Sequence, residues 1–264
     1  MRTIHFFVLV FFLPLICGAA ESVPGNFRVE NELTVLQTGE KVKTTTLFAG
    51  ELVYDMIGEH GETTIFNKAE DTFTLLEPTL RIQATVNASR LKEEVLKRRN
   101  TMTFEPHQQF YKFAAFPKFE ETFEQESGLA RFQSSWMDYQ IETMPLPDDA
   151  FRQRYYDFCD WFCFLNLRVN PDSTTLFARM EVNRCLHQRK RFPKKIHLDV
   201  YRKGNFGIAG IVAAPDVFTV THQLGTRFIP NDERCLQRIN EQRQAFRVVS
   251  FDEYLKERSS SEPQ

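Results

Sequence analysis

Apolar and polar residues alternate along residues 27–86, which is the pattern of half-buried β-strands. In residues 27–35, for example, Phe27 and Val29 alternate with polar neighbours, and side chains two apart point to the same face of a strand. Further strands are predicted over residues 44–57, 62–66, 71–76 and 82–86. Because these segments are short, sequential and joined by turns, they predict an antiparallel meander.

A period of three to four residues predicts helices elsewhere in the chain. In the clearest helix, expected over 149–167, Tyr155, Phe158, Phe162 and Leu165 form one aromatic stripe. The last helix follows Ser250, which can form a capping box with Glu253. Other helices are expected over 90–99, 118–126 and 175–186, and after a cap at Asn231 or Asp232. Strands are expected over 136–143, 196–200, 207–213 and 217–224.

These segments together predict an α+β fold. The expected architecture is a mostly antiparallel, half-barrel-like sheet of about eight or nine strands, covered by helices in two batches. Residues 21–258 are expected to form a single α+β domain, and the alternative is a subdivision near residues 144–150. Residues 259–264 are polar and are predicted to be a disordered tail.

The first twenty residues have the layout of a secretory signal. Arg2 precedes a largely apolar run over residues 4–16, and small residues follow up to Ala20. The run is shorter than the roughly 20 residues that a membrane-spanning helix needs, which disfavours a retained anchor. Ile16 before Cys17 disfavours a lipoprotein signal. We therefore expect a signal peptide over 1–20 and an exported protein, either periplasmic or extracellular.

Composition adds two constraints. The chain has 26 phenylalanines, and aromatic side chains bury large areas, so the favoured interpretation is a Phe-packed core. The alternative is that some of them line a cavity for an apolar ligand. The formal net charge is only −2, with acidic residues in excess before residue 150 and basic residues after it. A mildly acidic exported protein is not expected to bind nucleic acid.

Four cysteines follow the expected signal: Cys159, Cys163, Cys185 and Cys235. They are too few for a disulfide scaffold, and the sequence does not fix their pairing. Cys159 and Cys163 share a helix face, and with Cys185 and His187 they have the ligand types of a zinc site. The favoured interpretation is nevertheless inert buried thiols, followed by one disulfide. No metal or cofactor is expected.

The sequence contains no motif for catalysis. It lacks a Gly-x-Ser-x-Gly elbow, a glycine-rich phosphate loop and a His-Glu-x-x-His pair. His197 and His222 fall in predicted strands, and His222 shares its face with Phe218, which is typical of a packed histidine. A hydrolase would need one of these histidines against a carboxylate in a shared cleft. We assign no catalytic residue and expect that the protein is not an enzyme.

Two groups of charged residues have both a structural and a functional interpretation. The densest run comprises Arg189, Lys190, Arg191, Lys194 and Lys195. Its simplest interpretation is a solvated loop, and its functional one is contact with an anionic membrane surface. The second group lies on the predicted helices and comprises Asp157, Asp160, Arg168, Arg179 and Asn183. An Arg–Asp pair between these helices would be a structural ion pair rather than a site.

Two parts of the chain resemble known families. The segments LFAGELVYDMIGEHGETTIF, TFTLLEP and RIQATV resemble the opening strands of the lipoprotein-carrier and outer-membrane-lipid-shuttle fold of Gram-negative envelopes. That resemblance covers residues 27–86 and implies an unclosed half-barrel with an apolar cavity for acyl chains. The chain departs from that family by starting with a strand where a helix is expected.

The second half, with YYDFCDWFCFLNLRVNP, LFARMEVNRCL and FRVVSFDEYL, is similar to uncharacterised secreted proteins of planctomycete-type bacteria. This resemblance implies no activity, and neither resemblance transfers a functional residue. From all these features we expect a non-catalytic exported binding protein, a carrier or sensor for a lipid or other apolar ligand. An envelope structural or protein-interaction module is the alternative, and a hydrolytic enzyme is less favoured.

Overall fold

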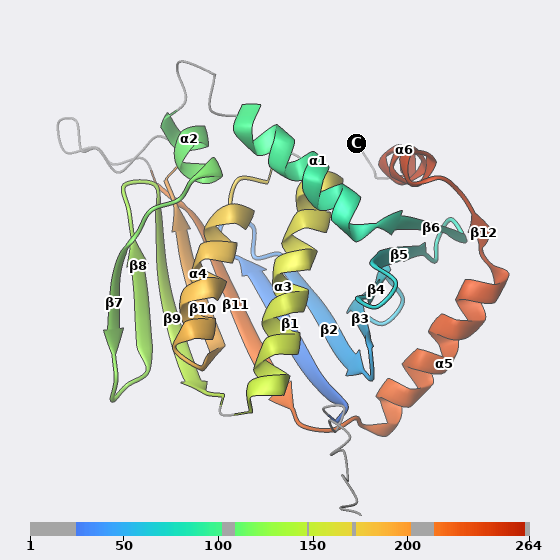
Figure 1. Cartoon of the computed structure of the whole chain (residues 1–264), viewed down its shortest axis with the longest axis horizontal. Coiled ribbons are helices and arrows are strands. Elements are labelled where there is room, and N and C mark those ends of the chain that lie inside the picture. The colour runs from blue at the N-terminus through green and yellow to red at the C-terminus, as the bar shows by residue number, and fades with distance from the viewer. Residues whose placement is uncertain (1–24, 102–108, 147, 171–172, 202–213, 262–264) are drawn as a thin grey trace, which may run out of the picture.

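The computed structural model describes residues 25–101, 109–146, 148–170, 173–201 and 214–261, which form one open sheet and six helices (Figure 1). Within these ranges, none of the helices is both long and apolar enough to span a bilayer. The expected signal over 1–20 and the expected strand over 207–213 lie outside the described residues.

The sheet has twelve strands, rather than eight or nine, in the order β12-β6-β5-β4-β3-β2-β1-β11-β10-β9-β8-β7. All neighbours are antiparallel except β12 and β6. The strands are β1 (Phe27–Val35), β2 (Lys41–Ala49), β3 (Leu52–Ile57), β4 (Thr63–Asn67), β5 (Thr72–Glu77), β6 (Ile82–Asn87), β7 (Glu120–Glu124), β8 (Leu129–Gln133), β9 (Met137–Pro145), β10 (Arg191–Val200), β11 (Asp216–Gly225) and β12 (Arg247–Val248). The helices are α1 (Ala88–Thr101), α2 (Gln109–Ala115), α3 (Asp149–Val169), α4 (Leu176–Gln188), α5 (Pro230–Ala245) and α6 (Phe251–Ser261).

Several differences from the expected elements have local causes. The single strand expected over 44–57 is the hairpin of β2 and β3, because Gly50 turns the chain with a φ of +55°. The helix predicted over 118–126 is wrong: this segment contains β7, which pairs with β8. In β7 only Phe123 is partly covered between exposed polar neighbours, so the acidic run is the exposed side of a strand. The short strand β12, paired with β6, was not expected.

One end of each of the last two helices also differs from expectation. Helix α6 continues to Ser261, so residues 259–261 are helical rather than part of a tail; the hydroxyls of these serines donate to carbonyls of the preceding turn. The capping box of Ser250 and Glu253 is present, with hydrogen bonds of 2.8 and 2.9 Å to Glu253. Helix α5 is capped at Ile229, and Asp232 acts from its third position by accepting from the Ile229 amide at 2.8 Å.

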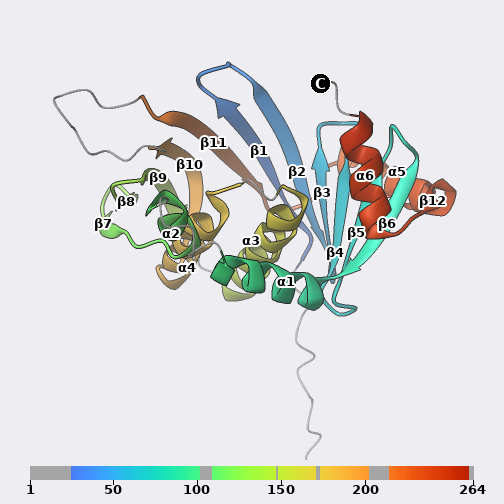
Figure 2. The ribbon, with the colours of Figure 1, turned by 90° about the horizontal axis from the view of Figure 1, so that it is seen from above.

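Strands from both sides of residues 144–150 belong to the same sheet. Strand β11 lies between β1 and β10, and it pairs with β1 over the register Arg28–Gly225 to Val35–Phe218. The sheet bends around α3 and α4, as the view from above shows (Figure 2). We call the face that carries these helices the inner face and the opposite one the outer face.

The two faces carry separate hydrophobic cores. On the inner face, a large core joins the sheet to α1, α3, α4 and α6. On the outer face, α5 covers strands β2–β5 with a smaller core that includes Leu47, Ile65 and Ile239. The buried carboxylate of Asp232 in α5 also lies 3.2 Å from Nε of Arg28 in β1, which ties this helix to the sheet.

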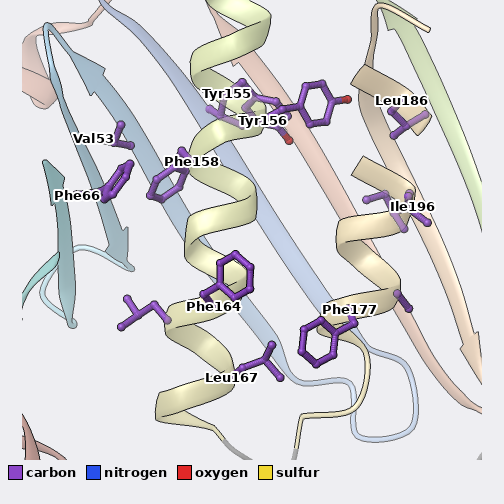
Figure 3. Close-up of a cluster of buried hydrophobic side chains, with 14 of the residues drawn as sticks. Val53, Phe66, Tyr155, Tyr156, Phe158, Phe164, Leu167, Phe177, Leu186 and Ile196 are labelled. Atoms are coloured by element: carbon purple, nitrogen blue, oxygen red, sulfur yellow. The ribbon is translucent and has the colours of Figure 1, made fainter. Parts of the chain in front are cut away.

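Helix α3 fills the middle of the inner face, as its aromatic stripe predicted. Asp148 caps the helix by accepting from the Phe151 amide at 2.8 Å. Phe158 lies against Val53 and Phe66, while Tyr155 and Tyr156 lie on the side of α4 and β10 (Figure 3). Phenylalanine rings of the core stack on one another as well, for example Phe66 on Phe73 with centroids 4.7 Å apart. Much of the phenylalanine excess therefore builds the core.

Candidate ligand-binding site

A band of polar residues crosses the inner face of the central strands. Asn31 of β1 is paired in register with Thr44 of β2 and His222 of β11. The Asn31 amide donates to the Thr44 hydroxyl at 3.0 Å, and its Oδ1 lies 2.6 Å from Nδ1 of His222. Since Asn31 Oδ1 is an acceptor, His222 carries its proton on Nδ1 and presents Nε2 as an acceptor.

The next row of this band contains a buried carboxyl group. The Thr46 hydroxyl donates to Asp55 at 2.6 Å, and both side chains are buried. Burial raises the pKa of Asp55 to about 6, and the hydrogen bond from Thr46 opposes this shift. Within the described residues, no cation lies at salt-bridge distance from Asp55. The hydrogen bond from the Thr46 hydroxyl does not by itself offset the effect of burial, so the pKa of Asp55 stays raised.

Helices α3 and α4 place polar side chains over the same part of the sheet. Arg179 and Asn183 are one turn apart on α4, so they share a face. The guanidinium of Arg179 lies close enough to Cys159 of α3, Tyr139 of β9 and His222 for its charge to influence the pKa of each group. Burial raises the pKa of the Cys159 thiol to about 12, and burial followed by the charge of Arg179 lowers the pKa of His222 to about 3.

Four of these side chains hold a buried polar atom that no protein group in the described residues contacts. The atoms are Nη1 of Arg179, Oη of Tyr139, Oδ1 of Asn183 and Nε2 of His222. Tyr139 and Asn183 are only 2% and 1% exposed. Since buried polar atoms in proteins almost always have a hydrogen-bond partner, the unpartnered guanidinium nitrogen of Arg179 and the three unpartnered atoms of Tyr139, Asn183 and His222 define a candidate binding site. We call these four residues the inner polar cluster.

The expected ion pair between α3 and α4 does not form among the described residues. Asn183 instead donates to Asp160 at 3.4 Å. The remaining charges that the sequence placed on these helices pair elsewhere: Asp157 binds Lys68 at 2.5 Å, and Arg168 binds Asp252 at 3.0 Å. An Arg–Asp pair between these helices would have been structural, but in the described residues Asp160 of α3 faces the Asn183 amide and Arg179 has no carboxylate within salt-bridge distance.

The two histidines considered for catalysis do not meet a carboxylate in a cleft. His197 lies on the outer face of β10, where its Nε2 is 3.3 Å from Asp199 and 38% of its side chain is exposed. His222 contacts an asparagine rather than an acid. The described residues thus contain no histidine-based hydrolytic arrangement at either position.

The four cysteines of the described residues are free thiols. Cys235 lies in the outer core under α5, far along the fold from Cys159 and Cys163 in α3. His187, proposed with them as a zinc ligand, stacks on Tyr156 with centroids 5.1 Å apart. The zinc alternative is not supported, because Cys159, Cys163, Cys185 and His187 do not form a group with metal-ligand spacing in the described residues.

A different trio, Glu121, Glu181 and Cys185, does have ligand atoms within 4.8 Å of one another. Its carboxylates already bind Arg184 and Arg189, however. We therefore assign no metal to this trio.

Three residues of the basic run contact neighbouring elements, and the other two are exposed to solvent. Arg189 pairs with Glu121 at 3.5 Å, Lys190 with Asp149 at 3.6 Å, and Arg191 donates to the Thr143 hydroxyl at 2.9 Å. These three residues tie the turn between α4 and β10 to neighbouring elements. Lys194 and Lys195 are exposed.

Hollows at the surface lie apart from the inner polar cluster. One of about 650 Å³ is lined mainly by residues next to β7 and β9, among them Phe119 and Trp136. A smaller one, of about 270 Å³, opens where Asp160 of α3 faces Phe177 and Met180 of α4. Neither contains a set of groups suited to catalysis.

Comparisons with known proteins assign no family to this chain. No protein-family model matches the chain, and no curated protein is significantly similar to it in sequence. The structure of PNGF-II in the C2 space group is similar with a TM-score of 0.28 and 4% sequence identity, over 85% of this chain and 30% of that one. The chain thus spans less than a third of the length of PNGF-II. The structure itself defines the class of the protein: it is an α+β protein built on one large, mostly antiparallel open sheet.

Proposed function

We propose that this protein is an exported, non-catalytic binding protein that carries or senses a lipid or another apolar ligand. The ligand would lie on the inner face of the sheet, next to α3 and α4. The observation that carries the proposal is a strip of apolar residues there that the helices leave partly uncovered.

This apolar strip occupies one end of the central strands. It comprises Leu33, Val35, Val42, Phe218 and Val220, which the register places on the inner face in two adjacent rows. All five keep part of their surface accessible, whereas Phe27 and Phe48, on the same face at the other end, are fully buried. A concave, largely apolar surface with a few polar groups nearby is typical of small-molecule sites.

The shape of the sheet supports the same proposal. The bend around α3 and α4 (Figure 2) is half-barrel-like, which is the form implied by the resemblance of residues 27–86 to lipid-shuttle strands. On this proposal, the exposed Lys194 and Lys195 would face an anionic membrane surface when ligand is exchanged.

The alternatives have less support among the described residues. A protein-interaction module would present a contiguous apolar patch, but the exposed large apolar side chains lie on separate elements: Leu36, Ile57, Tyr111, Phe116, Ile229 and Val248. A hydrolase would need a histidine next to a carboxylate in a cleft, and neither His197 nor His222 has this arrangement.

The proposal is tested by native mass spectrometry of the protein purified from its export compartment, followed by organic extraction. We expect a co-purifying mass that the extraction releases as a lipid or other apolar compound. A bare polypeptide mass that stays unchanged after incubation with envelope lipids would overturn the proposal.

A further inference from the structure

We infer that the ligand carries an anionic head group, a carboxylate or a phosphate, and that Arg179 binds this group. The inference rests on the proposed function and narrows its ligand class to acidic amphiphiles. The head group would lie at the two donors of the inner polar cluster, Nη1 of Arg179 and Oη of Tyr139, and the alkyl chain would follow the apolar strip.

The first argument is the unpaired charge of Arg179. An arginine side chain stays protonated in proteins, and a buried charge without a partner is strongly unfavourable. Another interior arginine has an anionic partner: Nη1 of Arg152, whose side chain is nearly buried, binds Asp149 at 2.6 Å and the Leu146 carbonyl at 3.2 Å, although its Nε has no hydrogen-bond partner. Arg179 has no carboxylate within 4 Å in the described residues, and its Nη1 has no partner at all. An anion would supply what Asp149 supplies to Arg152.

The second argument is the chemistry of the groups around Arg179. Burial raises the pKa values of Tyr139 and of the Cys159 and Cys163 thiols, so these groups keep their protons and add no negative charge. The Tyr139 hydroxyl has no partner in the described residues and is free to donate. The nearest acid, Asp160, accepts from Asn183 instead of Arg179. One cation with a neutral donor beside it is a setting in which carboxylates and phosphates form strong, charge-assisted hydrogen bonds.

The third argument is the position of the cluster relative to the apolar strip. His222 and Val220 are two residues apart on β11, so their side chains share the inner face. Phe218 continues the same row, and His222 to Phe218 spans about 13 Å of strand. Arg179 and His222 also keep part of their surface accessible although they lie between the helices and the sheet. The four unpartnered atoms themselves are buried, so a ligand would reach them through the partly accessible surfaces of Arg179 and His222. His222 adjoins one end of the apolar strip, and Tyr139 lies in the row of Leu198 and Phe218 at its other end.

The test compares two probes with the same alkyl chain, dodecanoate and dodecanol, by calorimetric titration of the delipidated protein at pH 8. We expect wild-type protein to bind dodecanoate at least tenfold more tightly than dodecanol. Arg179→Met, which keeps the length of the side chain and removes its charge, is expected to lose at least tenfold in dodecanoate affinity and to keep its dodecanol affinity. Arg184→Met on the same helix is the control, because Arg184 is half-exposed and pairs with Glu181; it should change neither affinity.

The possible results separate this inference from the proposed function. Equal affinity of wild-type protein for both probes, or a folded Arg179→Met variant with unchanged dodecanoate affinity, would refute the role of Arg179 and leave the carrier proposal intact. If wild-type protein binds neither probe, both proposals are wrong. The comparison of dodecanoate with dodecanol on wild-type protein tests the preference for an anionic head group without any variant. This test remains valid even if Arg179→Met does not fold.

Discussion

Replacing Asp55 by asparagine is expected to stabilise the protein at neutral pH. Burial raises the pKa of this carboxyl group from 3.8 to about 6, so the folded protein holds the proton more tightly than the unfolded chain does. The penalty of the ionised form is therefore small near pH 4, grows as the pH rises, and is complete above pH 6. At about 1.4 kcal/mol per pKa unit, a shift of this size corresponds to roughly 3 kcal/mol.

Asparagine at position 55 is neutral at every pH, and its oxygen still accepts the hydrogen bond from Thr46. We expect the free energy of unfolding of Asp55→Asn to exceed that of the wild type by about 2–3 kcal/mol at pH 8. At pH 4 the difference should be less than about 1 kcal/mol. Asp160, whose pKa burial also raises to about 6, is present in both proteins, so the difference isolates Asp55.

Urea unfolding followed by tryptophan fluorescence, at one-unit steps between pH 4 and pH 8, measures this difference directly. Asp252→Asn is the control, because the Asp252 side chain is exposed and the substitution should give no gain that grows with pH. A difference between Asp55→Asn and wild type that is constant across the range, or that shrinks as the pH rises, would refute the assignment of a raised pKa to Asp55.

Two further substitutions and one labelling experiment test a helix cap, a turn and the cysteines. Asp232→Ala should lower the free energy of unfolding by about 2–4 kcal/mol in urea titrations, because it removes the cap at Ile229 and the partner of the mostly buried Arg28; a loss under 1 kcal/mol would contradict this role. Gly128→Ala should lower it by about 1–3 kcal/mol, because Gly128 has a φ of +70° and its new Cβ would clash with Arg191; an unchanged unfolding midpoint would show that the turn adapts. Alkylation under denaturing, non-reducing conditions should label Cys159, Cys163, Cys185 and Cys235, and a mass deficit of two labels would reveal a disulfide.

The local pattern of the sequence predicted the elements whose buried face is regular. The stripe of Tyr155, Phe158, Phe162 and Leu165 predicted α3, and alternation predicted β1 and the meander, because a buried face forces an apolar residue at every second, third or fourth position. The same reasoning failed at β7. There only Phe123 is partly buried, and the glutamates that resemble a helix surface lie on an exposed strand.

The inner polar cluster could not be predicted from the sequence. Tyr139, Arg179 and His222 come from β9, α4 and β11, and only the strand order and the position of α4 bring them together. No motif links residues so far apart in the chain. The one sequence signal was an arginine on a helix with aromatic and thiol neighbours, and we interpreted it as half of an ion pair. Whether this arginine meets a carboxylate, however, depends on side-chain directions that periodicity does not specify.

The most direct test of the central claim compares one variant on each face of β1 for the amount of co-purifying ligand. Leu33 lies on the inner face in the apolar strip, and Thr34 points to the outer face. Native mass spectrometry of the purified proteins should show ligand on wild-type protein and on Thr34→Lys. The Leu33→Lys variant should be largely empty, because a lysine would place a charge in the strip. Equal ligand occupancy in folded Leu33→Lys and Thr34→Lys would contradict binding on the inner face.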